Sequence, residues 1–312
     1  MTSSYTAALS AAHDAAADQH YPPSTLYVVA TPIGNLADIT LRALHVLALA
    51  DAIACEDTRH TQTLLRAYGI DKNTSQLIAL HQHNEEQAAQ VVIDHLRQGQ
   101  RVAYVSDAGT PGVSDPGARL VAAVRAQGLR AMPLPGASSV TTVLSAAGVS
   151  EAGGGAGGFV FVGFLPNKAG ERALAVQVLA TQERAVVLLE APHRIEAFAQ
   201  AMKPLGTRLI TVGRELTKQF EEIATVSADA LSDWLAGDSN RLRGEFALVL
   251  HPALIEPSSD PDTRILQLLL AELPLKTAVK LAADISGEPR NALYALALTL
   301  KNGNGGAEPN RR

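Results

Sequence analysis

The stretch SDAGTPGVSDPG, residues 106–117, decides how the first half of this chain is expected to fold. It directly follows the apolar run RVAYV, residues 101–105, which is typical of a buried strand. Its glycines permit a positive φ or a close approach of backbone to a ligand, and its prolines restrict the turns between them. Asp115 is predicted to cap a helix over residues 118–126, with Pro116 at the first helical position. The pattern predicts a strand, a rigid loop and a helix, which form either a ligand-binding loop of an α/β sheet or an ordinary connection.

Strands and helices alternate on both sides of this loop. Strands are predicted at residues 26–30, 51–55, 76–80, 101–105 and 129–134, and helices at residues 39–50, 61–67, 84–98, 118–126 and 140–147. Because helices that connect parallel strands lie on the faces of the sheet, this order predicts a parallel or mostly parallel sheet covered on both faces. We expect residues 26–150 to form an N-terminal α/β domain.

The run GGGAGG, residues 153–158, has the spacing of a dinucleotide-binding fingerprint but follows a helix and precedes a strand. Since that fingerprint must follow a strand and open a helix, residues 151–158 are interpreted as a linker between domains. Further strands are predicted at residues 159–162, 185–190, 208–212, 221–226 and 244–250, and helices at residues 172–179 and 195–202 and around Trp234. Residues 159–255 are therefore expected to form a second α/β domain with a mixed sheet.

The polar segment EPSSDPD, residues 256–262, separates this domain from a part of the chain with helical patterns only. Within residues 263–301, a helix at 275–285, the turn SGEP and a helix opened by Pro289 have the outline of a helix-turn-helix. A plain packing hairpin of helices fits the same pattern. Residues 302–312 are expected to be a disordered tail.

Composition and charge exclude several classes of protein. The chain has 312 residues, 47% of them apolar, and a net charge of −5, so nucleic acid would have to be bound by a local patch rather than by bulk charge. Its single cysteine, Cys55, lies in an apolar run and is interpreted as a buried structural thiol in a cytoplasmic protein.

The N-terminal segment offers little beyond alanine to bury, and residues 1–25 are predicted to be a disordered tail. The first lysine or arginine of the chain is Arg42, so no secretory signal is expected. No uncharged apolar run approaches the ~18–20 residues needed to span a bilayer, and no membrane association is expected.

Several motifs together resemble one family. They are TPIGNLADIT (31–40), CEDTRHT (55–61), HQHNE (81–85), SDAGTPGVSDPG (106–117), PGASS (135–139), GFLP (163–166), EAPHR (190–194), GRELTK (213–218) and RGEFALVL (243–250). This set is similar to the ribosomal RNA small-subunit methyltransferase I family, within the tetrapyrrole-methylase-like (class III) enzymes that use S-adenosylmethionine. The resemblance implies two α/β domains with the cofactor in the cleft between them, a small C-terminal helical domain, and a homodimer. It also implies methylation of the ribose 2′-hydroxyl of a cytidine near the decoding centre of 16S rRNA, with 16S rRNA or the small ribosomal subunit as partner.

Candidate site residues follow from these motifs. Cofactor binding is assigned to Asp107, Ala108, Gly109, Thr110, Pro111, Ser138, Ser139, Phe164, Leu165, Glu190, Ala191, Gly244, Glu245 and Phe246. Glu56 and Arg59 are the catalytic candidates, because they follow a strand at the same sheet end as the central loop. Their other interpretation is a helix cap at Asp57 with Arg59 as its ion-pair partner. RNA contact is assigned to cations in predicted loops and in the C-terminal unit, namely Arg59, Lys168, Arg194, Arg214, Lys218 and Arg290.

No metal site is expected, since His81, His83 and Glu85 lack further ligands nearby in the sequence. Two other functions are compatible with the fold that the resemblance implies. One is C-methylation of a tetrapyrrole, and the other is a non-catalytic ribosome-binding factor.

Overall fold

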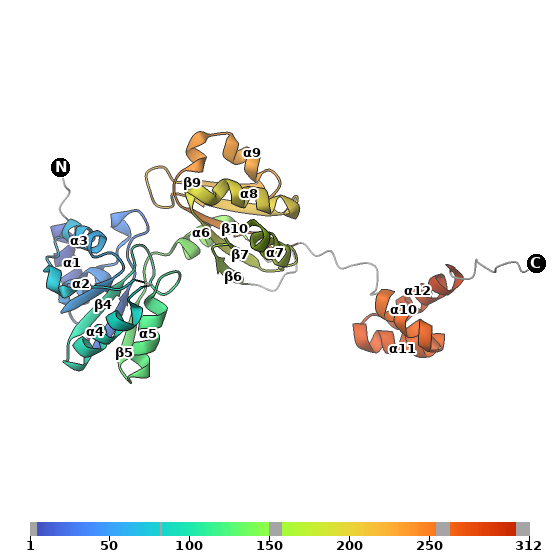
Figure 1. Ribbon diagram of the computed structural model, residues 1–312, viewed down its shortest axis with the longest axis horizontal. Helices are drawn as coiled ribbons and strands as arrows, with labels where there is room; N and C mark the ends of the chain where they lie inside the picture. Colours follow the sequence, from blue (N-terminus) through green and yellow to red (C-terminus); the bar gives the residue numbers. More distant parts are fainter. Residues whose placement is uncertain (1–4, 82, 150–157, 254–262, 304–312) are drawn as a thin grey trace, which may run out of the picture. The chain divides into compact units, whose positions relative to one another are not determined.

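The computed structural model describes residues 5–81, 83–149, 158–253 and 263–303 (Figure 1). The chain divides into a larger unit, Met1–Ala253, and a smaller unit, Leu254–Arg312. The predicted linker at 151–158, except for Gly158, and the tail beyond residue 303 lie outside the described residues. No helix in the described ranges is both long and apolar enough to cross a membrane.

The first sheet of the larger unit is parallel throughout, as predicted. Its strands are β1 (Thr25–Val29), β2 (Ala52–Cys55), β3 (Leu77–Ala79), β4 (Arg101–Val105) and β5 (Arg130–Leu134), in the order β3-β2-β4-β1-β5. The helices that follow β1 to β5 in turn are α2 (Leu41–Leu49), α3 (Thr58–Ala67), α4 (Glu85–Arg97), α5 (Gly117–Ala126) and α6 (Ser139–Ala147), with short 3-10 helices η1 (Leu36–Asp38) and η2 (Thr74–Gln76).

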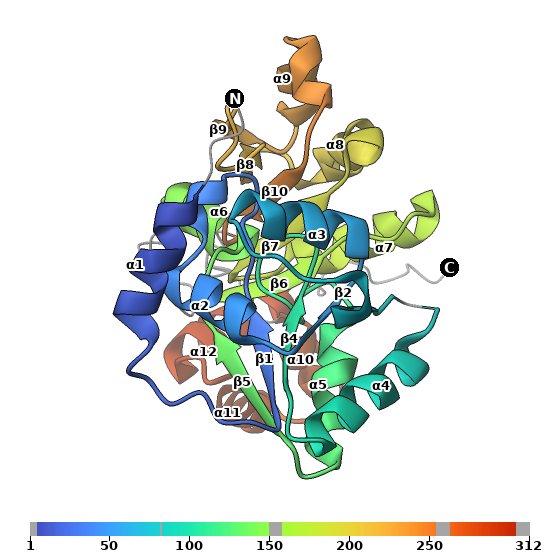
Figure 2. The ribbon, with the colours of Figure 1, turned by 90° about the vertical axis from the view of Figure 1, so that its left-hand side faces the viewer.

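Alternate residues of the central strands face opposite cores. In β4, Ala103 and Val105 pack with α2 and α3, whereas Val102 and Tyr104 pack with α4 and α5. Figure 2 shows α2 and the N-terminal helix α1 (Thr6–Ala16) on one side of this sheet and α4 and α5 on the other. Because β4 is covered on both faces, its continuous apolar sequence is the pattern expected of a central parallel strand.

Much of the N-terminal segment is a helix, so the prediction of a disordered tail at 1–25 is wrong for the residues that the structure describes there, 5–25. Helix α1 (Thr6–Ala16) packs against α2, and its Ala12 and Ala16 are almost fully buried. Tyr5, just before it, packs on the ring of Tyr68 with centroids 5.7 Å apart. The prediction failed because alanine offers little apolar surface to bury. A small side chain nevertheless lets two helix backbones approach closely, and the aromatic residues supply the remaining apolar surface.

The second sheet is mixed, as predicted. Its strands are β6 (Phe159–Gly163), β7 (Ala185–Glu190), β8 (Leu209–Arg214), β9 (Glu222–Ser227) and β10 (Phe246–Leu250), in the order β6-β7-β10-β8-β9. Only β6 and β7 are parallel, and the other pairs are antiparallel. One face is covered by α7 (Ala169–Ala180), α8 (Ile195–Met202) and α9 (Leu231–Ala236), with 3-10 helices η4 (Pro192–Arg194), η5 (Lys203–Leu205) and η6 (Ser239–Leu242).

Helix α6 covers the other face of this second sheet, although it follows the last strand of the first sheet. Its Val140 and Val143 lie in one buried cluster with Val187 and Val249. Gly213 of β8 allows this approach, because an added Cβ would lie 3.1 Å from Val143 Cγ2. The domain boundary predicted at residue 150 therefore falls after a helix that packs with the second sheet.

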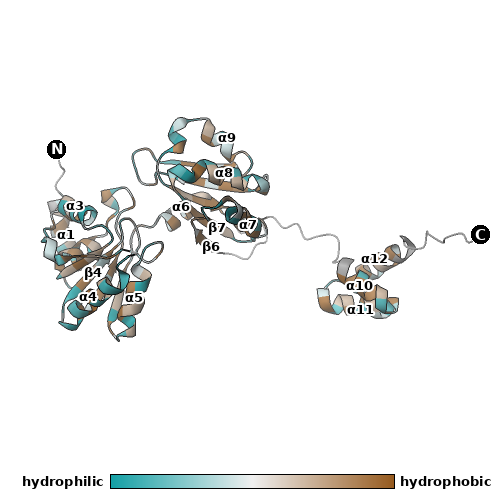
Figure 3. Cartoon of the chain, in the orientation of Figure 1, coloured by the Kyte–Doolittle hydropathy of each residue, from teal (hydrophilic) through white to brown (hydrophobic). Residues whose placement is uncertain are grey.

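The smaller unit consists of α10 (Thr263–Glu272), α11 (Leu275–Ser286) and α12 (Arg290–Gly303). Its own buried cluster includes Leu266, Val279 and Leu293, one residue from each helix. Figure 3 shows apolar residues on all three helices as well as along the strands of both sheets. Helix α11 ends at Gly287 with φ +74°, which is the left-handed conformation that glycine favours at a helix C-terminus.

Candidate active site

Asp115 organises the central loop at 106–117. Its Oδ1 accepts hydrogen bonds from the Tyr104 hydroxyl (2.7 Å) and the Gly117 amide (2.8 Å), and its Oδ2 accepts from the amides of Gly112 (2.6 Å) and Val113 (3.3 Å). Helix α5 begins at Gly117 with Pro116 as its N-cap, so the prediction of Asp115 as the cap was one residue early. Asp115 instead fixes the whole turn that precedes the helix.

A second set of bonds holds the loop against the segments that follow β1 and β5. Thr31 and Gly109 exchange two backbone hydrogen bonds, at 3.0 and 3.1 Å, and the Thr110 hydroxyl donates to the carbonyl of Ala137 at 2.9 Å. Gly109 has φ +82°, and an added Cβ would lie 3.1 Å from Ile33 Cγ2. The loop therefore requires glycine here, both for its conformation and for this close contact.

Two adjoining cavities lie beside this loop, between the first sheet's loops and the second sheet, with volumes of about 340 and 150 Å³. Residues predicted to bind the cofactor line one or both of them, namely Ala108, Gly109, Thr110, Ser138, Ser139, Phe164, Glu190, Ala191, Glu245 and Phe246. The larger volume falls within the range of small-molecule sites. The sequence motifs thus come together around one space.

The other four predicted cofactor residues adjoin lining residues along the chain. Asp107 accepts a hydrogen bond from the Asp57 amide at 3.3 Å, and Pro111 is buried next to Thr110. The Leu165 side chain belongs to the buried core of the second sheet. Gly244 has φ +89°, the left-handed conformation that glycine adopts without strain.

Four apolar residues that line the larger cavity were not among the predicted site residues. They are Ile33, Leu189, Leu216 and Ala247, and Ser114 and Gly213 also line this cavity. Ile33 and Leu216 lie inside quoted motifs, TPIGN and GRELTK, so position in a motif was an available signal. Leu189 and Ala247 are ordinary strand residues whose side chains reach the cavity only because the two halves of the chain pack together.

Glu56 lines the smaller cavity, beside Asp115. Its Oε1 accepts a hydrogen bond from the Asp107 amide at 3.1 Å. Burial raises the pKa of Glu56, and the nearby carboxylates of Asp107 and Asp115 raise it further, although the Asp107 amide opposes them. A carboxyl group held in this way accepts a proton more readily than an exposed glutamate does.

Asp57 and Arg59 adopt the alternative arrangement considered for them. Asp57 is the N-cap of α3 and accepts from the amides of Arg59 (2.8 Å) and His60 (3.3 Å). Arg59 pairs with Asp57 at 3.4 Å, and its side chain is 91% exposed. An ion pair this exposed contributes little to stability, so Arg59 remains available for contact with a ligand.

The structure also places the neighbouring cysteine and histidines. Cys55 is buried, and burial raises the pKa of its thiol to about 11, which agrees with an inert structural residue. The ring Nδ1 of His81 accepts from the His83 amide. Among the described residues, no group of three or more histidine, cysteine, aspartate or glutamate side chains is arranged to hold a metal ion.

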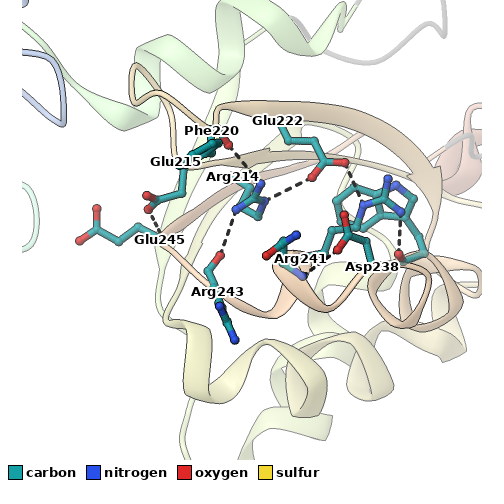
Figure 4. A network of polar contacts seen from close by, with 10 residues as sticks. Arg214, Glu215, Phe220, Glu222, Asp238, Arg241, Arg243 and Glu245 are labelled. Carbon is teal, nitrogen blue, oxygen red and sulfur yellow. Dashed lines mark hydrogen bonds and ion pairs between the residues drawn. The ribbon is translucent and has the colours of Figure 1, made fainter.

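Two of the predicted RNA-contact arginines are built into the second sheet's domain instead of lying in open loops. Arg214 is the last residue of β8 and binds the Glu222 carboxylate and the carbonyls of Phe220 and Arg243 (Figure 4). Glu222 also binds Arg241 at 2.8 Å. The prediction of a loop position for Arg214 is wrong, because β8 extends two residues beyond its apolar run.

Arg194 lies in η4, and its guanidinium donates to the carbonyl of Leu165 and pairs with Glu190 at 3.0 Å. The Glu190 side chain is fully buried, and burial raises its pKa, while Arg194 acts in the opposite direction. Arg194 therefore joins the end of β6 to the end of β7 behind the cavity wall.

The remaining predicted cations have different surroundings. Lys168 and Arg290 are mostly exposed and pair with Glu171 and Asp284. Lys218 binds the carboxylates of Glu215 and Glu245. Arg290 belongs to the smaller unit.

Two family models match the chain. That of Tetrapyrrole (Corrin/Porphyrin) Methylases matches residues 25–232, and that of the RsmI C-terminal HTH domain matches residues 256–301. The second match identifies the smaller unit as a helix-turn-helix domain instead of a plain helical hairpin.

Curated relatives are similar along most of their length. Ribosomal RNA small subunit methyltransferase I of Neisseria meningitidis serogroup A is 48% identical over 282 residues, which make up 89% of this chain and 94% of the relative. The protein of the same name from Escherichia coli O157:H7 is 45% identical over 277 residues, covering 88% and 94% of the two chains.

Solved structures share the fold at lower identity. Uroporphyrin-III-C-methyltransferase from Thermus thermophilus has a TM-score of 0.52 at 20% identity, over 74% of this chain and 96% of that one. Another structure of that enzyme, complexed with S-adenosyl homocysteine, has a TM-score of 0.50 at 17% identity, over 74% and 98% of the two chains.

Proposed function

Because the chain belongs to the ribosomal RNA small subunit methyltransferase I family of the tetrapyrrole methylases, we propose that it methylates 16S rRNA with S-adenosylmethionine. The acceptor in this proposal is the ribose 2′-hydroxyl of a cytidine near the decoding centre. The observation that carries the proposal is the identity of 48% over 94% of a relative with this name. The helix-turn-helix match adds a domain suited to nucleic acid.

The larger cavity suits the adenosine part of the donor. Ile33, Phe164 and Leu189 give it apolar walls, and loop 106–117 brings backbone close to its edge. Glu190 lines the cavity, and its buried Oε2 has no hydrogen-bond partner among the described residues. A hydrogen-bond donor on the bound molecule would satisfy this oxygen, so the residues present fit the cofactor.

S-adenosylmethionine would supply a methyl group on a sulfonium, and in-line attack of the ribose oxygen on that methyl would release the neutral thioether S-adenosylhomocysteine. The contribution of this chain is to hold donor and acceptor at the right distance and angle. The loop that Asp115 and Thr31 fix in place is the part of the site that keeps the donor's orientation. The 2′-hydroxyl must also lose its proton. We assign this step to Glu56, whose raised pKa makes it a better base than an exposed glutamate.

Contact with RNA is proposed for Arg59 and Lys168, which are exposed, and for Arg290 in the smaller unit. These cations would bind phosphate and set the position of the strand without reading its sequence. Arg214 and Arg194 are left out of this set, because their guanidinium groups already bind carboxylates and carbonyls of the chain. The proposal also includes a homodimer in the cytoplasm.

The decisive test is mass-spectrometric mapping of ribose methylation in 16S rRNA, with and without the protein. Unmethylated small ribosomal subunits and free 16S rRNA are offered separately, and each is supplied with S-adenosylmethionine. One new 2′-O-methylcytidine is expected near the decoding centre. Its absence from both substrates, although the donor binds, would refute the proposal and favour a non-catalytic ribosome-binding role.

The fold also permits C-methylation of a tetrapyrrole, since the larger unit shares its fold with uroporphyrin-III-C-methyltransferase. The same assay with a porphyrinogen acceptor tests this second function. Methyl transfer to the macrocycle and not to RNA would replace the first proposal with the second.

A further inference from the structure

A wide, open groove lies along two loops whose preceding residues line the donor cavity. It is lined by Tyr5, by residues 34–36 and by residues 217–219, and has a volume of about 590 Å³. Ile33 and Leu216, the residues that precede these two loop segments, line the donor cavity. The groove and the donor cavity are therefore neighbours along both loops, and the groove is large enough for a nucleotide-sized group.

The two loops meet closely at Gly34. An added Cβ there would lie 2.4 Å from Lys218 Cγ, 2.9 Å from Thr217 Oγ1 and 3.1 Å from the Leu216 carbonyl oxygen. This contact joins the segment after β1 to the segment after β8. It fixes one end of the groove next to the donor cavity.

Tyr5 gives the groove an aromatic side chain from a part of the chain that the tetrapyrrole methylase model does not include, since that match begins at residue 25. Its ring is held by Tyr68, and α1 behind it packs on α2. An aromatic ring fixed in this way loses little conformational freedom when a flat group stacks on it.

The polar groups of the groove suit an uncharged partner better than a phosphate. The charge of Lys218 is offset by Glu215 and Glu245, and the Glu221 carboxylate accepts from the Thr217 amide. Thr217 Oγ1 is buried and has no hydrogen-bond partner among the described residues. Because this oxygen is packed against Gly34, it is not open to a ligand in the groove. Surplus negative charge repels phosphate, so an uncharged flat group fits this groove better.

We propose that this groove binds a nucleobase of the RNA strand next to the acceptor nucleotide, stacked on the ring of Tyr5. The inference rests on the proposed function, because it supplies a subsite for that RNA. Unpaired bases of RNA are commonly held by stacking on aromatic side chains. The groove offers such a contact on a ring that the fold holds in place.

The test compares Tyr5→Leu and Tyr5→Phe with the wild type in the full-length protein. RNA affinity is measured by filter retention of 16S rRNA, and donor affinity by calorimetry. Tyr5→Leu is expected to weaken RNA binding by about 5- to 100-fold, and Tyr5→Phe by about twofold or less, because stacking needs the ring. Donor affinity should stay within about twofold in both variants.

Two further variants separate a base contact from the support that α1 gives. Leu9→Ala is the matched control, since Leu9 is in the same helix and packs in the same core. It should leave RNA affinity within about twofold of the wild type. Thr217→Val removes only the buried hydroxyl of a groove residue and should also leave RNA affinity within about twofold of the wild type.

Unchanged RNA affinity in Tyr5→Leu would overturn the inference, and so would an equal loss in Leu9→Ala, which would show that only the docking of α1 matters. Failure of the proposed function looks different, because the wild type would then transfer no methyl group to RNA. The affinity comparison decides the role of the groove in that case too, since it requires no methyl transfer.

Discussion

The substitution Asp115→Asn tests whether the central loop must be held rigid for donor binding. The carboxylate accepts four hydrogen bonds, from Tyr104, Gly112, Val113 and Gly117. An asparagine has one acceptor oxygen and an NH₂ group in place of the other. If the asparagine oxygen faces Tyr104 and Gly117, the amides of Gly112 and Val113 face its NH₂ group. Because that group is itself a donor, these two hydrogen bonds are lost.

The magnitude follows from the bonds that are lost. The Gly112 bond is short, at 2.6 Å, whereas the Val113 bond is long, at 3.3 Å. A hydrogen bond to a charged group contributes about 1.5–3 kcal/mol, so the pair is expected to cost about 2–3 kcal/mol. A cost of about 2 kcal/mol corresponds to a roughly 30-fold change in an equilibrium constant.

Calorimetry with S-adenosylmethionine and thermal unfolding measure this cost together. We expect the Kd for the donor to rise by about 10- to 30-fold, with a decrease in Tm of about 4–8 °C. The matched control is Asp238→Asn. Asp238 Oδ1 accepts from the Asn240 amide at 2.9 Å, so the same change is made at a cap away from the cavities. Wild-type donor affinity and wild-type Tm in Asp115→Asn would refute the reasoning.

Three further predictions concern other parts of the larger unit. Gly34→Ala places a Cβ 3.1 Å from the Leu216 carbonyl oxygen, so the two loops must separate. The kcat/KM for methyl transfer should therefore fall about tenfold or more, and an unaltered kcat/KM would contradict the tight contact. Burial raises the pKa of Glu56 above 4.5, so the folded protein holds this proton more tightly than the unfolded chain does, and stability falls as pH rises from about 4.5 through the raised pKa. Glu56→Gln should reduce this slope in a series of denaturant titrations, leaving the part that the buried Glu190 contributes, and a slope equal to that of the wild type would exclude Glu56 as a source. Glu222→Gln leaves the buried Arg214 without its counter-charge and should lower stability by about 2 kcal/mol in urea, whereas a change below about 0.5 kcal/mol would show that the pair is unimportant.

Much of the fold could be predicted because it depends on local patterns. The alternation of apolar strands with helical segments indicated a parallel first sheet and a mixed second sheet, and both are present. Loop 106–117 could be recognised as rigid because glycine and proline restrict or permit backbone conformations wherever they occur. Ten of the fourteen predicted cofactor residues line the two cavities, because motifs that follow strand ends meet at one edge of a sheet.

The errors have a common cause, which is contact between segments far apart in the sequence. The local sequence of α1 gives no sign that Tyr5 packs on Tyr68, so it did not indicate that this helix is ordered. The charge of Arg214 indicated a position on the surface of the protein. In the structure, Glu222 lies opposite Arg214 on the neighbouring strand, and its carboxylate neutralises the guanidinium in a partly buried position.

The amino-acid sequence by itself determined the strands, most of the helices, the stiff loop after β4 and the family, since each depends on neighbouring residues or on short motifs. The tertiary structure alone decided that α6 covers the second sheet, that Asp115 binds four donors, and which side chains line the cavities. Those features depend on packing and on hydrogen-bond geometry across tens to hundreds of residues. Such distances in space are set only when the whole chain has folded.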